Sequence, residues 1–400
     1  MKSSKLTQIL TWILGVLMLV LLMIWINRET LSTAVGGSYF EKMEAEHLQE
    51  AFRGIETSEG QAEGLFPIQA TGVSTQPIVA AARAFLQSLD ADQQAAVSFP
   101  VDDEEWRRWC NVDNGIFTRQ GVSLKEMNPA QKEAAFGLLS ASLSAKGLSL
   151  SKDIMKTDQT LREFNDDNEI FDEELYFFTI MGEPSATEPW GWQLDGHHLI
   201  INYFVLGDQV VMTPTFLGAE PVIATTGKYA GNTLFQDEQN LGLAFMKGLP
   251  EDLQQAALLD PEKTHNHNKA EAFKDNLTID YEGLSVAKLD SIQRTELLHL
   301  VGLYIHNMRE DHARIKMEEV EAHLEDTWFV WKGQLTEDGV FYYRIHSPVL
   351  LIEFDHQRAV GAPADDDLPT RNHIHTVIRT PNGNDYGKDL LRQHLERHHH

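Results

Sequence analysis

The stretch Tyr176–Phe204 reads YFFTIMGEPSATEPWGWQLDGHHLIINYF and carries the clearest strand signal in the sequence. Short runs of β-branched and aromatic residues are separated by turn residues at Gly182-Glu183-Pro184 and at Asp195-Gly196. Runs of this kind between turns are typical of antiparallel strands, so we predict a hairpin-rich sheet here. The stretch also contains the adjacent pair His197-His198, which a strand alone does not require.

A weaker copy of this stretch returns at Thr327–Asp355, TWFVWKGQLTEDGVFYYRIHSPVLLIEFD, and the two align without a gap. The aligned positions that keep the same residue include Gly182 and Gly333, Leu199 and Leu350, and Ile201 and Ile352. Two further blocks repeat upstream in the same order. They are Ala84–Leu89 with Ala244–Leu249, and Gly121–Leu143 with Gly283–Ile305. Because three blocks recur in one order, the pattern indicates an internal duplication.

We therefore predict an α+β protein with two homologous halves, residues 78–240 and residues 241–395. Each half is expected to contain helices followed by an antiparallel sheet, and a pseudo-twofold axis is expected to relate the halves. Asn128-Pro129 marks a helix start, because asparagine caps helices and proline suits the first turn. The second half ends in a histidine-rich strand at Asn372–Arg379, which follows the polar insertion His356–Arg371.

The N-terminal segment Ile9–Ile26 holds no charged residue across 18 positions, which is long enough to cross a bilayer. We predict a transmembrane anchor at residues 9–26 and a cytoplasmic tip at residues 1–8, because Lys2 and Lys5 precede the span. Residues 27–77 are polar and are expected to form a stalk. The bulk of the chain would then be extracytoplasmic, periplasmic or on the cell surface, with the membrane as a partner. A cleaved signal peptide is the alternative.

The composition argues against nucleic-acid binding and against cysteine chemistry. The chain contains 33 Lys and Arg against 60 Asp and Glu, a net charge of −27. A surface that binds a nucleic-acid duplex needs clustered basic residues, so we expect no nucleic-acid partner. Cys110 is the only cysteine, which excludes an intrachain disulfide and a cysteine-based zinc site.

Four histidines form the candidate metal site. His373 and His375 lie two residues apart in a predicted strand, so both imidazoles point to one face. His197 and His198 are adjacent, and only an irregular backbone would let both reach one pocket. If the two sheets meet across the pseudo-twofold axis, three or four imidazoles converge and suit zinc or copper. The alternative is that these are surface histidines on exposed strands.

Two carboxylates and two tryptophans complete the set of candidate site residues. Glu353 and Asp355 share one face of an apolar strand, where an acid needs a partner. We predict them as catalytic residues, either as a general base or as orienters of a ligand histidine, with a solvated strand face as the alternative. Trp190 and Trp192 share a strand face and would stack on a flat small-molecule ligand, with core packing as the alternative.

Four ordered segments, GEPSATEPWGWQLDGHHL, TPTFLGAEP, YYRIHSPVLLIEFD and NHIHTVIRTPNGNDYGKDLL, give the chain a family resemblance. From about Pro77 to about His394 it resembles the bacterial domain-of-unknown-function family 3500, whose members look exported. The resemblance implies functional positions at His197, His198, Asn372, His373 and His375. It implies no particular reaction.

The sequence thus predicts a membrane-anchored extracytoplasmic protein with a histidine-rich transition-metal site. As an enzyme it would be a metal-dependent hydrolase or a copper oxidoreductase. Two alternatives stay open at this point. One is a non-catalytic envelope protein that binds a metal or a small-molecule ligand, and the other is a structural envelope protein whose histidines form hydrogen bonds in the core. The oligomeric state does not follow from the sequence.

Overall fold

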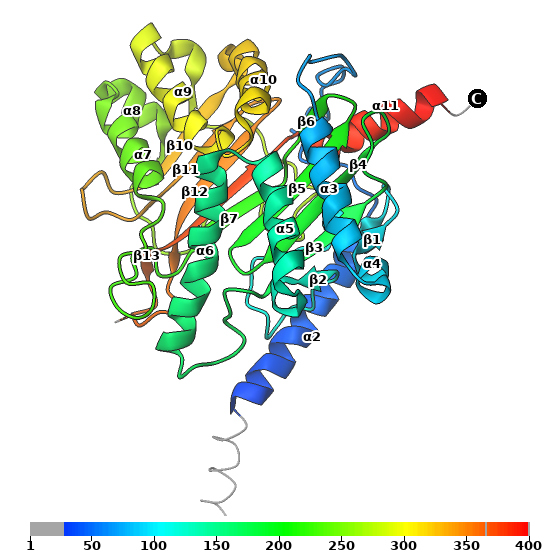
Figure 1. The fold of residues 1–400 in the computed structure, drawn as a ribbon. Helices are drawn as coiled ribbons and strands as arrows, with labels where there is room; N and C mark the ends of the chain where they lie inside the picture. Colours follow the sequence, from blue (N-terminus) through cyan, green and yellow to red (C-terminus); the bar gives the residue numbers. More distant parts are fainter. Residues whose placement is uncertain (1–27, 365, 399–400) are drawn as a thin grey trace, which may run out of the picture.

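The computed structural model describes residues 28–398 except residue 365, and one order of elements recurs in the two halves of the chain (Figure 1). The first half contains α3 (Gln76–Ser88), α4 (Ala91–Val97), β1 (Ser98–Phe99), β2 (Val122–Ser123), α5 (Pro129–Ser142), α6 (Ala145–Phe164), β3 (Tyr176–Met181), β4 (Trp190–Gly196), β5 (Leu199–Leu206), β6 (Gln209–Val211) and β7 (Thr215–Ala219). The second half contains α7 (Gln236–Gly248), α8 (Glu251–Ala257), β8 (Leu258–Asp260), β9 (Leu284–Ser285), α9 (Ser291–Ile305), α10 (Glu310–Ala322), β10 (Trp328–Gly333), β11 (Phe341–His346), β12 (Leu351–Arg358) and β13 (Pro369–Arg379). The helices α2 (Arg28–Gln49) and α11 (Lys388–His398) flank the halves, and short 3-10 turns are η1 (Glu104–Arg107), η2 (Leu124–Glu126), η3 (Val286–Lys288), η4 (Leu324–Asp326) and η5 (Asp385–Gly387).

A single 13-stranded sheet runs through both halves. Its strand order is β1-β3-β4-β5-β7-β13-β12-β11-β10-β8, and β2, β6 and β9 pair beside this path. The sheet is mixed, because β1 pairs with β3 in parallel and β8 pairs with β10 in parallel, whereas the long strands are antiparallel. The protein is therefore α+β, but the prediction of two separate antiparallel sheets is wrong. The pairing of β7 with β13 fuses them.

The two halves also repeat a local backbone contact. Gly121 has a φ of +87°, and a Cβ atom added to it would lie 2.1 Å from the backbone oxygen of Phe178. Gly283 has a φ of +83°, and its added Cβ would lie 2.5 Å from the oxygen of Phe329. These pairs occupy aligned positions in the repeated sequence blocks, and only glycine fits such a conformation and approach.

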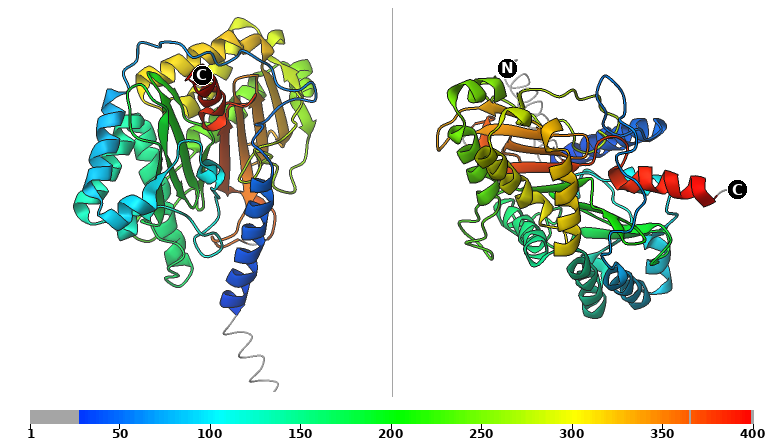
Figure 2. Two further views of the ribbon diagram at one scale, coloured as in Figure 1. Left: turned by 90° about the vertical axis from the view of Figure 1, so that its right-hand side faces the viewer. Right: turned by 90° about the horizontal axis from the view of Figure 1, so that it is seen from above.

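Each face of the sheet carries its own hydrophobic core. Helices α3, α5 and α6 of the first half and α7, α9 and α10 of the second pack on one face. Loops, the segment before α3 and the terminal helices α2 and α11 cover the other (Figure 2). The central strands are buried on both sides, and every residue of Leu199–Leu206 is buried.

The segment between α2 and α3, which we predict as part of a stalk, contributes to the second of these cores. Ile55 and Phe66 are buried members of this core, and Leu65 packs against it. The backbone amide of Ile279 donates to the carbonyl oxygen of Glu56 at 2.8 Å, so the segment is also hydrogen-bonded to the second half. Residues 50–75 therefore belong to the packed body of the protein.

The predictions for the N-terminus need a correction. The predicted cytoplasmic tip (residues 1–8) and transmembrane anchor (residues 9–26) lie outside the described residues. Within the part of the chain that the structure describes, no helix has both the length and the apolarity needed to cross a bilayer. The prediction of a transmembrane anchor, and of the extracytoplasmic location that depends on it, is corrected accordingly.

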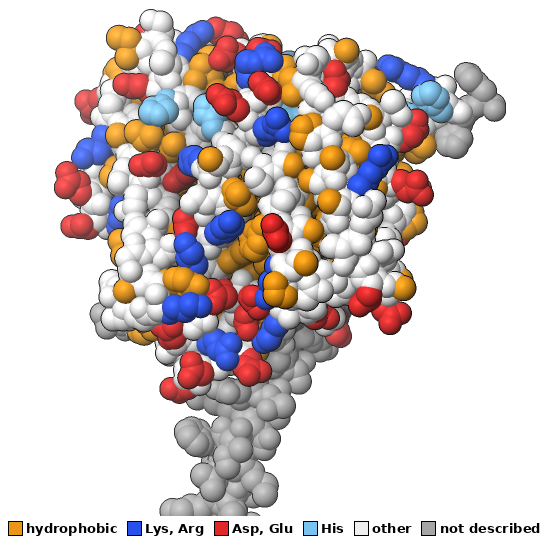
Figure 3. All heavy atoms as spheres, in the orientation of Figure 1, with side chains coloured by type: hydrophobic (Ala, Val, Ile, Leu, Met, Phe, Trp, Pro, Cys, Tyr) orange, Lys and Arg blue, Asp and Glu red, His pale blue; other side chains and the backbone are white. Residues whose placement is uncertain are grey.

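Charged side chains on the helix-covered face are mixed in sign. Figure 3 shows acidic side chains interspersed with Lys and Arg over this face. On α10, for example, Arg314 pairs with Glu318 at 2.6 Å and Lys316 pairs with Glu319 at 2.5 Å. The net negative charge of the chain thus forms no single acidic patch on this face.

Asp275 connects four segments of the loop-covered face. Its Oδ1 accepts hydrogen bonds from Arg379 at 2.6 Å and from the Tyr386 hydroxyl at 2.9 Å. Its Oδ2 accepts from Arg107 at 3.0 Å and lies 2.9 Å from Nε2 of His47. Burial alone would raise the pKa of this carboxyl, but its cationic partners hold the pKa well below the usual range.

We predict that Asp275→Asn lowers the free energy of unfolding at pH 7 by about 3–5 kcal/mol, because it leaves buried cations without their counter-charge. Since the pKa of Asp275 is lowered by folding, its contribution is present above the unfolded value of about 3.9 and is lost as the pH falls below it. Urea unfolding between pH 7 and pH 3 measures both effects. The exposed Asp338→Asn is the control, and equal stability of the two variants at pH 7 would contradict the prediction.

Candidate metal centre

Three neighbouring strands bring histidines from both halves together. His198 lies in the two-residue turn between β4 and β5 and has a left-handed φ of 61°. His373 and His375 lie on β13. Strand β7 sits between β5 and β13 and pairs with both, which places the turn of one half beside the histidine strand of the other.

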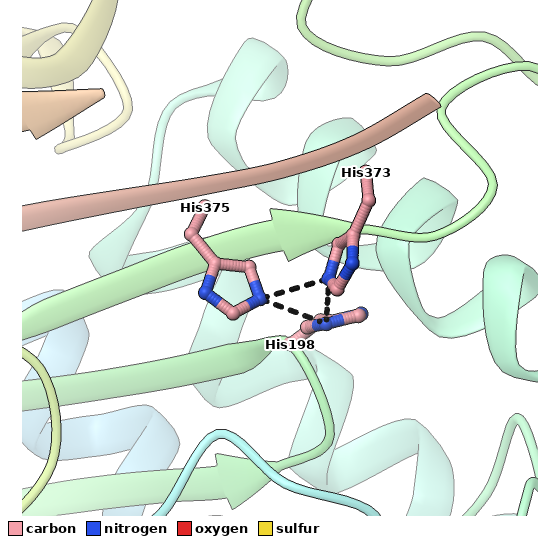
Figure 4. A group of neighbouring side chains, drawn as sticks. All are labelled: His198, His373 and His375. Carbon is pink, nitrogen blue, oxygen red and sulfur yellow. Dashed lines mark hydrogen bonds between the residues drawn. The ribbon is translucent and has the colours of Figure 1, made fainter. Parts of the chain in front are cut away.

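The three imidazoles point toward one another, and their Nε2 atoms form a nearly equilateral triangle (Figure 4). Nε2 of His198 lies 3.2 Å from Nε2 of His373 and 3.2 Å from Nε2 of His375. Nε2 of His373 lies 3.0 Å from Nε2 of His375. The residues are 2%, 4% and 7% exposed in sequence order, so the triangle is almost closed to solvent. Three buried histidines therefore lie close enough to bind one metal ion.

Gly218 makes this approach possible. It pairs with His375 across β7 and β13, and its amide donates to the carbonyl oxygen of His198 at 2.8 Å. A Cβ atom at this position would lie 3.1 Å from Cδ2 of His198 and 3.2 Å from Cδ2 of His375. A glycine inside a strand often marks such a close approach.

Hydrogen bonds on the outer side of the triangle fix two of the tautomers. Nδ1 of His373 lies 2.5 Å from the carbonyl oxygen of Arg358, and Nδ1 of His375 lies 2.7 Å from Oε1 of Glu271. Both oxygens only accept, so both Nδ1 atoms must carry the proton. In the neutral rings, the Nε2 atoms of His373 and His375 therefore present lone pairs to each other.

The surroundings of His198 and His373 favour the neutral form of these two imidazoles. Burial, together with the neighbouring imidazoles, lowers the pKa of His198 well below its usual value. Burial lowers the pKa of His373 to about 4, although Glu220 acts in the opposite direction. Oε2 of Glu220 lies 3.7 Å from Nδ1 of His373. Neutral imidazole is the form of histidine that binds metals.

His197, which we predicted as a fourth ligand, is not part of the triangle. Its Nδ1 lies 2.6 Å from Oδ1 of Asp158, and its ring stacks on that of His198 with centroids 3.9 Å apart. Burial lowers the pKa of His197, but the charge of Asp158 more than offsets this and the net shift is upward. His197 therefore supports the position of His198 from the side.

The predicted catalytic carboxylates, Glu353 and Asp355, accept hydrogen bonds from the backbone of the loop that carries Glu271. Oxygens of Glu353 accept from the backbone amides of Lys269 and Ala270, at 2.9 and 2.8 Å for Oε2. Oδ2 of Asp355 accepts from the amide of His267 at 2.6 Å. In the described part of the chain, neither carboxylate hydrogen-bonds to the three imidazoles. Their loop carries Glu271, the partner of His375.

Trp190 and Trp192 lie in the core under the helices rather than on a surface. Both are 0% exposed. The Trp190 indole donates to the carbonyl oxygen of Ser185 at 2.9 Å, and Trp192 stacks on Tyr203 with centroids 5.3 Å apart. In the structure the two indoles pack in the core, which is the alternative to the predicted ligand stacking.

The model of the family described as protein of unknown function (DUF3500) matches residues 71–388. The chain belongs to this family. The resemblance to domain-of-unknown-function family 3500 is thereby confirmed. Comparisons with the curated proteins and with the solved structures gave no match.

Two residues at the candidate site of this DUF3500 protein, Asp158 and Glu271, were not predicted from the sequence, although the pattern around Asp158 indicates a buried carboxylate. Asp158 stands on the apolar face of α6 with Ile154, Met155 and Leu161, all of them buried. A carboxylate at that spacing needs a buried partner, which here is His197. Glu271 left no such signal, because it lies in an aperiodic polar loop.

We predict that Gly218→Ala lowers the stability of the DUF3500 protein by about 1–3 kcal/mol, because the added methyl group crowds two imidazoles and the backbone of β13. Urea unfolding measures the change. Gly137→Ala in α5 is the matched control, since a Cβ there meets nothing within 4 Å. Unchanged stability of Gly218→Ala would show that the imidazoles can separate freely.

Proposed function

We propose that this protein binds one transition-metal ion, zinc as the best match, through Nε2 of His198, His373 and His375, and acts as a metal-dependent hydrolase. The observation that carries the proposal is the pair of facing lone pairs on His373 and His375, whose Nε2 atoms are 3.0 Å apart. Two acceptors at this distance repel each other unless a cation lies between them. Nε2 of His198 carries at most one proton, so it can donate a hydrogen bond to only one of these two nitrogen atoms.

The size of the triangle supports a tetrahedral ion. Nitrogen ligands about 2.0–2.1 Å from a tetrahedral zinc ion lie roughly 3.3 Å from one another. The Nε2 separations here are 3.0, 3.2 and 3.2 Å. The three Nε2 atoms would hold such an ion, and a tetrahedral ion with only three protein ligands would keep a fourth position open.

The open position favours catalysis over a purely structural ion. Catalytic zinc sites characteristically use three protein ligands, whereas structural sites use four. A zinc ion bound in this way supplies Lewis acidity and a nucleophile derived from water at neutral pH. Within the chain, Glu271 and the Arg358 carbonyl orient two ligand rings, and the His197–Asp158 pair packs against the third. We assign Glu353 and Asp355 an indirect role, because their carboxylates accept hydrogen bonds from the loop that carries Glu271.

A second candidate is a non-catalytic metal-binding protein. The low exposure of the three histidines, between 2% and 7%, favours it, because a substrate needs a path to the ion. Copper is the alternative metal for either function, since imidazole ligands suit copper as well as zinc.

We expect purified full-length protein to contain roughly one equivalent of zinc or copper, and the double variant His373→Ala with His375→Ala to contain less than about 0.2 equivalents. Elemental analysis after dialysis measures both, and the exposed His299→Ala is the control. Less than about 0.2 equivalents in the unaltered protein, even after incubation with zinc or copper, would refute the metal site.

X-ray absorption and hydrolysis assays separate the two candidate functions. Three nitrogen ligands and one oxygen ligand, together with ester or phosphoester hydrolysis that disappears on chelation, favour the hydrolase. Four protein ligands without metal-dependent hydrolysis favour the non-catalytic protein.

We further expect Glu271→Gln to weaken metal affinity by about 10–100-fold, because the amide no longer provides a charged acceptor for Nδ1 of His375. Competition with a chromogenic chelator measures this change. Glu262→Gln is a control of the same chemistry, since Glu262 is exposed in the same loop region. Equal affinity of the Glu271 variant and the unaltered protein would exclude this role of the carboxylate.

A further inference from the structure

A second candidate site lies apart from the three histidines, where the start of β7 and the end of β13 meet α10. A cavity of about 650 Å³ opens between α10, β6 and residues 64–71, and the end of β13 reaches it through Ile378 and Thr380. In Figure 1, α10 and β6 lie near each other at the upper edge of the molecule. Among the described residues, none of the three histidines of the triangle lines this cavity. Its volume is in the range of small-molecule pockets.

The walls of the cavity combine apolar side chains with uncharged polar ones and carry little free charge. Side chains of Phe66, Met212, Ile305, Ile315 and Ile378 line it. The charged residues that line it are Lys316, Glu318 and Glu319, and each has an ion-pair partner on α10. A charged ligand would therefore find no unpaired counter-charge among these groups, whereas an uncharged ligand would be well accommodated.

His312 supplies an unused polar atom in this wall. The residue is 2% exposed, and its Nε2 has no hydrogen-bond partner within the part of the chain that the structure describes. Burial and the nearby charge of Arg309 lower the pKa of His312 to about 4, so the imidazole is uncharged at neutral pH. A buried polar atom without a partner is costly unless a ligand or solvent satisfies it.

We propose that this cavity binds an uncharged small molecule that presents an apolar surface and one polar group, and that the polar group hydrogen-bonds to Nε2 of His312. The site is separate from the metal site, because among the described residues none of the three histidines lines the cavity. The apolar side chains of the walls provide affinity through burial of the ligand's apolar surface, and His312 selects for the polar group.

The test is a fluorescence titration of the full chain with N-phenyl-1-naphthylamine, an uncharged apolar probe with a single N–H group. We expect saturable binding at one site. Ile315→Trp and Ala322→Trp, which fill the cavity from a half-buried and an exposed position of α10, should each weaken binding at least tenfold. Ile292→Trp, on the exposed surface of α9, should leave binding unchanged.

His312→Phe tests the polar contact, because it keeps the ring and removes the nitrogen atoms. We expect about three- to tenfold weaker binding, the effect of losing one neutral hydrogen bond. Thermal unfolding of each variant verifies that it is folded. The double variant His373→Ala with His375→Ala should bind the probe normally, which separates this site from the proposed metal function.

Three results would overturn the proposal. The first is unchanged affinity in both folded tryptophan variants. The second is unchanged affinity in His312→Phe. The third is equal or tighter binding of the anionic probe 8-anilinonaphthalene-1-sulfonate with the same sensitivity to the tryptophan variants, because this would exclude selection for uncharged molecules.

Discussion

The antiparallel pairing of β7 with β13 is the contact on which the rest of the architecture depends. Five residue pairs, from Ile374 with Ala219 to Ile378 with Thr215, join the halves into one sheet. Both strands are buried on both faces, so a shift of register would move apolar side chains out of one core and into the other. The same pairing sets His375 opposite Gly218 and beside the turn of His198. Sheet continuity and the candidate metal centre therefore have one cause.

The repeated scaffold and the unrepeated site have different sequence requirements. Gly121 and Gly283 accept the same close backbone approach in both halves, so their positions are fixed by the fold. The turn that carries His198 has no such counterpart, because Pro348-Val349 occupies the aligned positions of the second half. The proposed metal function thus uses one of two similar turns, together with the last strand of the other half.

Local patterns predicted the elements well, and the contacts between distant segments less well. The runs in Tyr176–Phe204 correspond to β3, β4 and β5, and Asn128 caps α5 with Gln131 as its capping-box partner. The histidine triangle could be anticipated from the spacing on β13 and from the repeat. The orientation of the His197 side chain could not be anticipated, since neighbouring residues of a tight turn can point to different partners. The fused sheet left no local signal, because the five residues of β7 read like any short strand.

The position of β7 and β13 at equivalent places in the two halves has a consequence for the history of the chain. A half on its own would end in an exposed strand edge, which is a template for pairing with a second copy. Two identical copies joined there would form a twofold dimer with equal turns at both ends. Joining the halves in one polypeptide removes that equality, so one turn can gain a histidine while the other keeps Pro348-Val349. The covalent linkage of the halves is thus what permits a single asymmetric site on a nearly symmetric sheet.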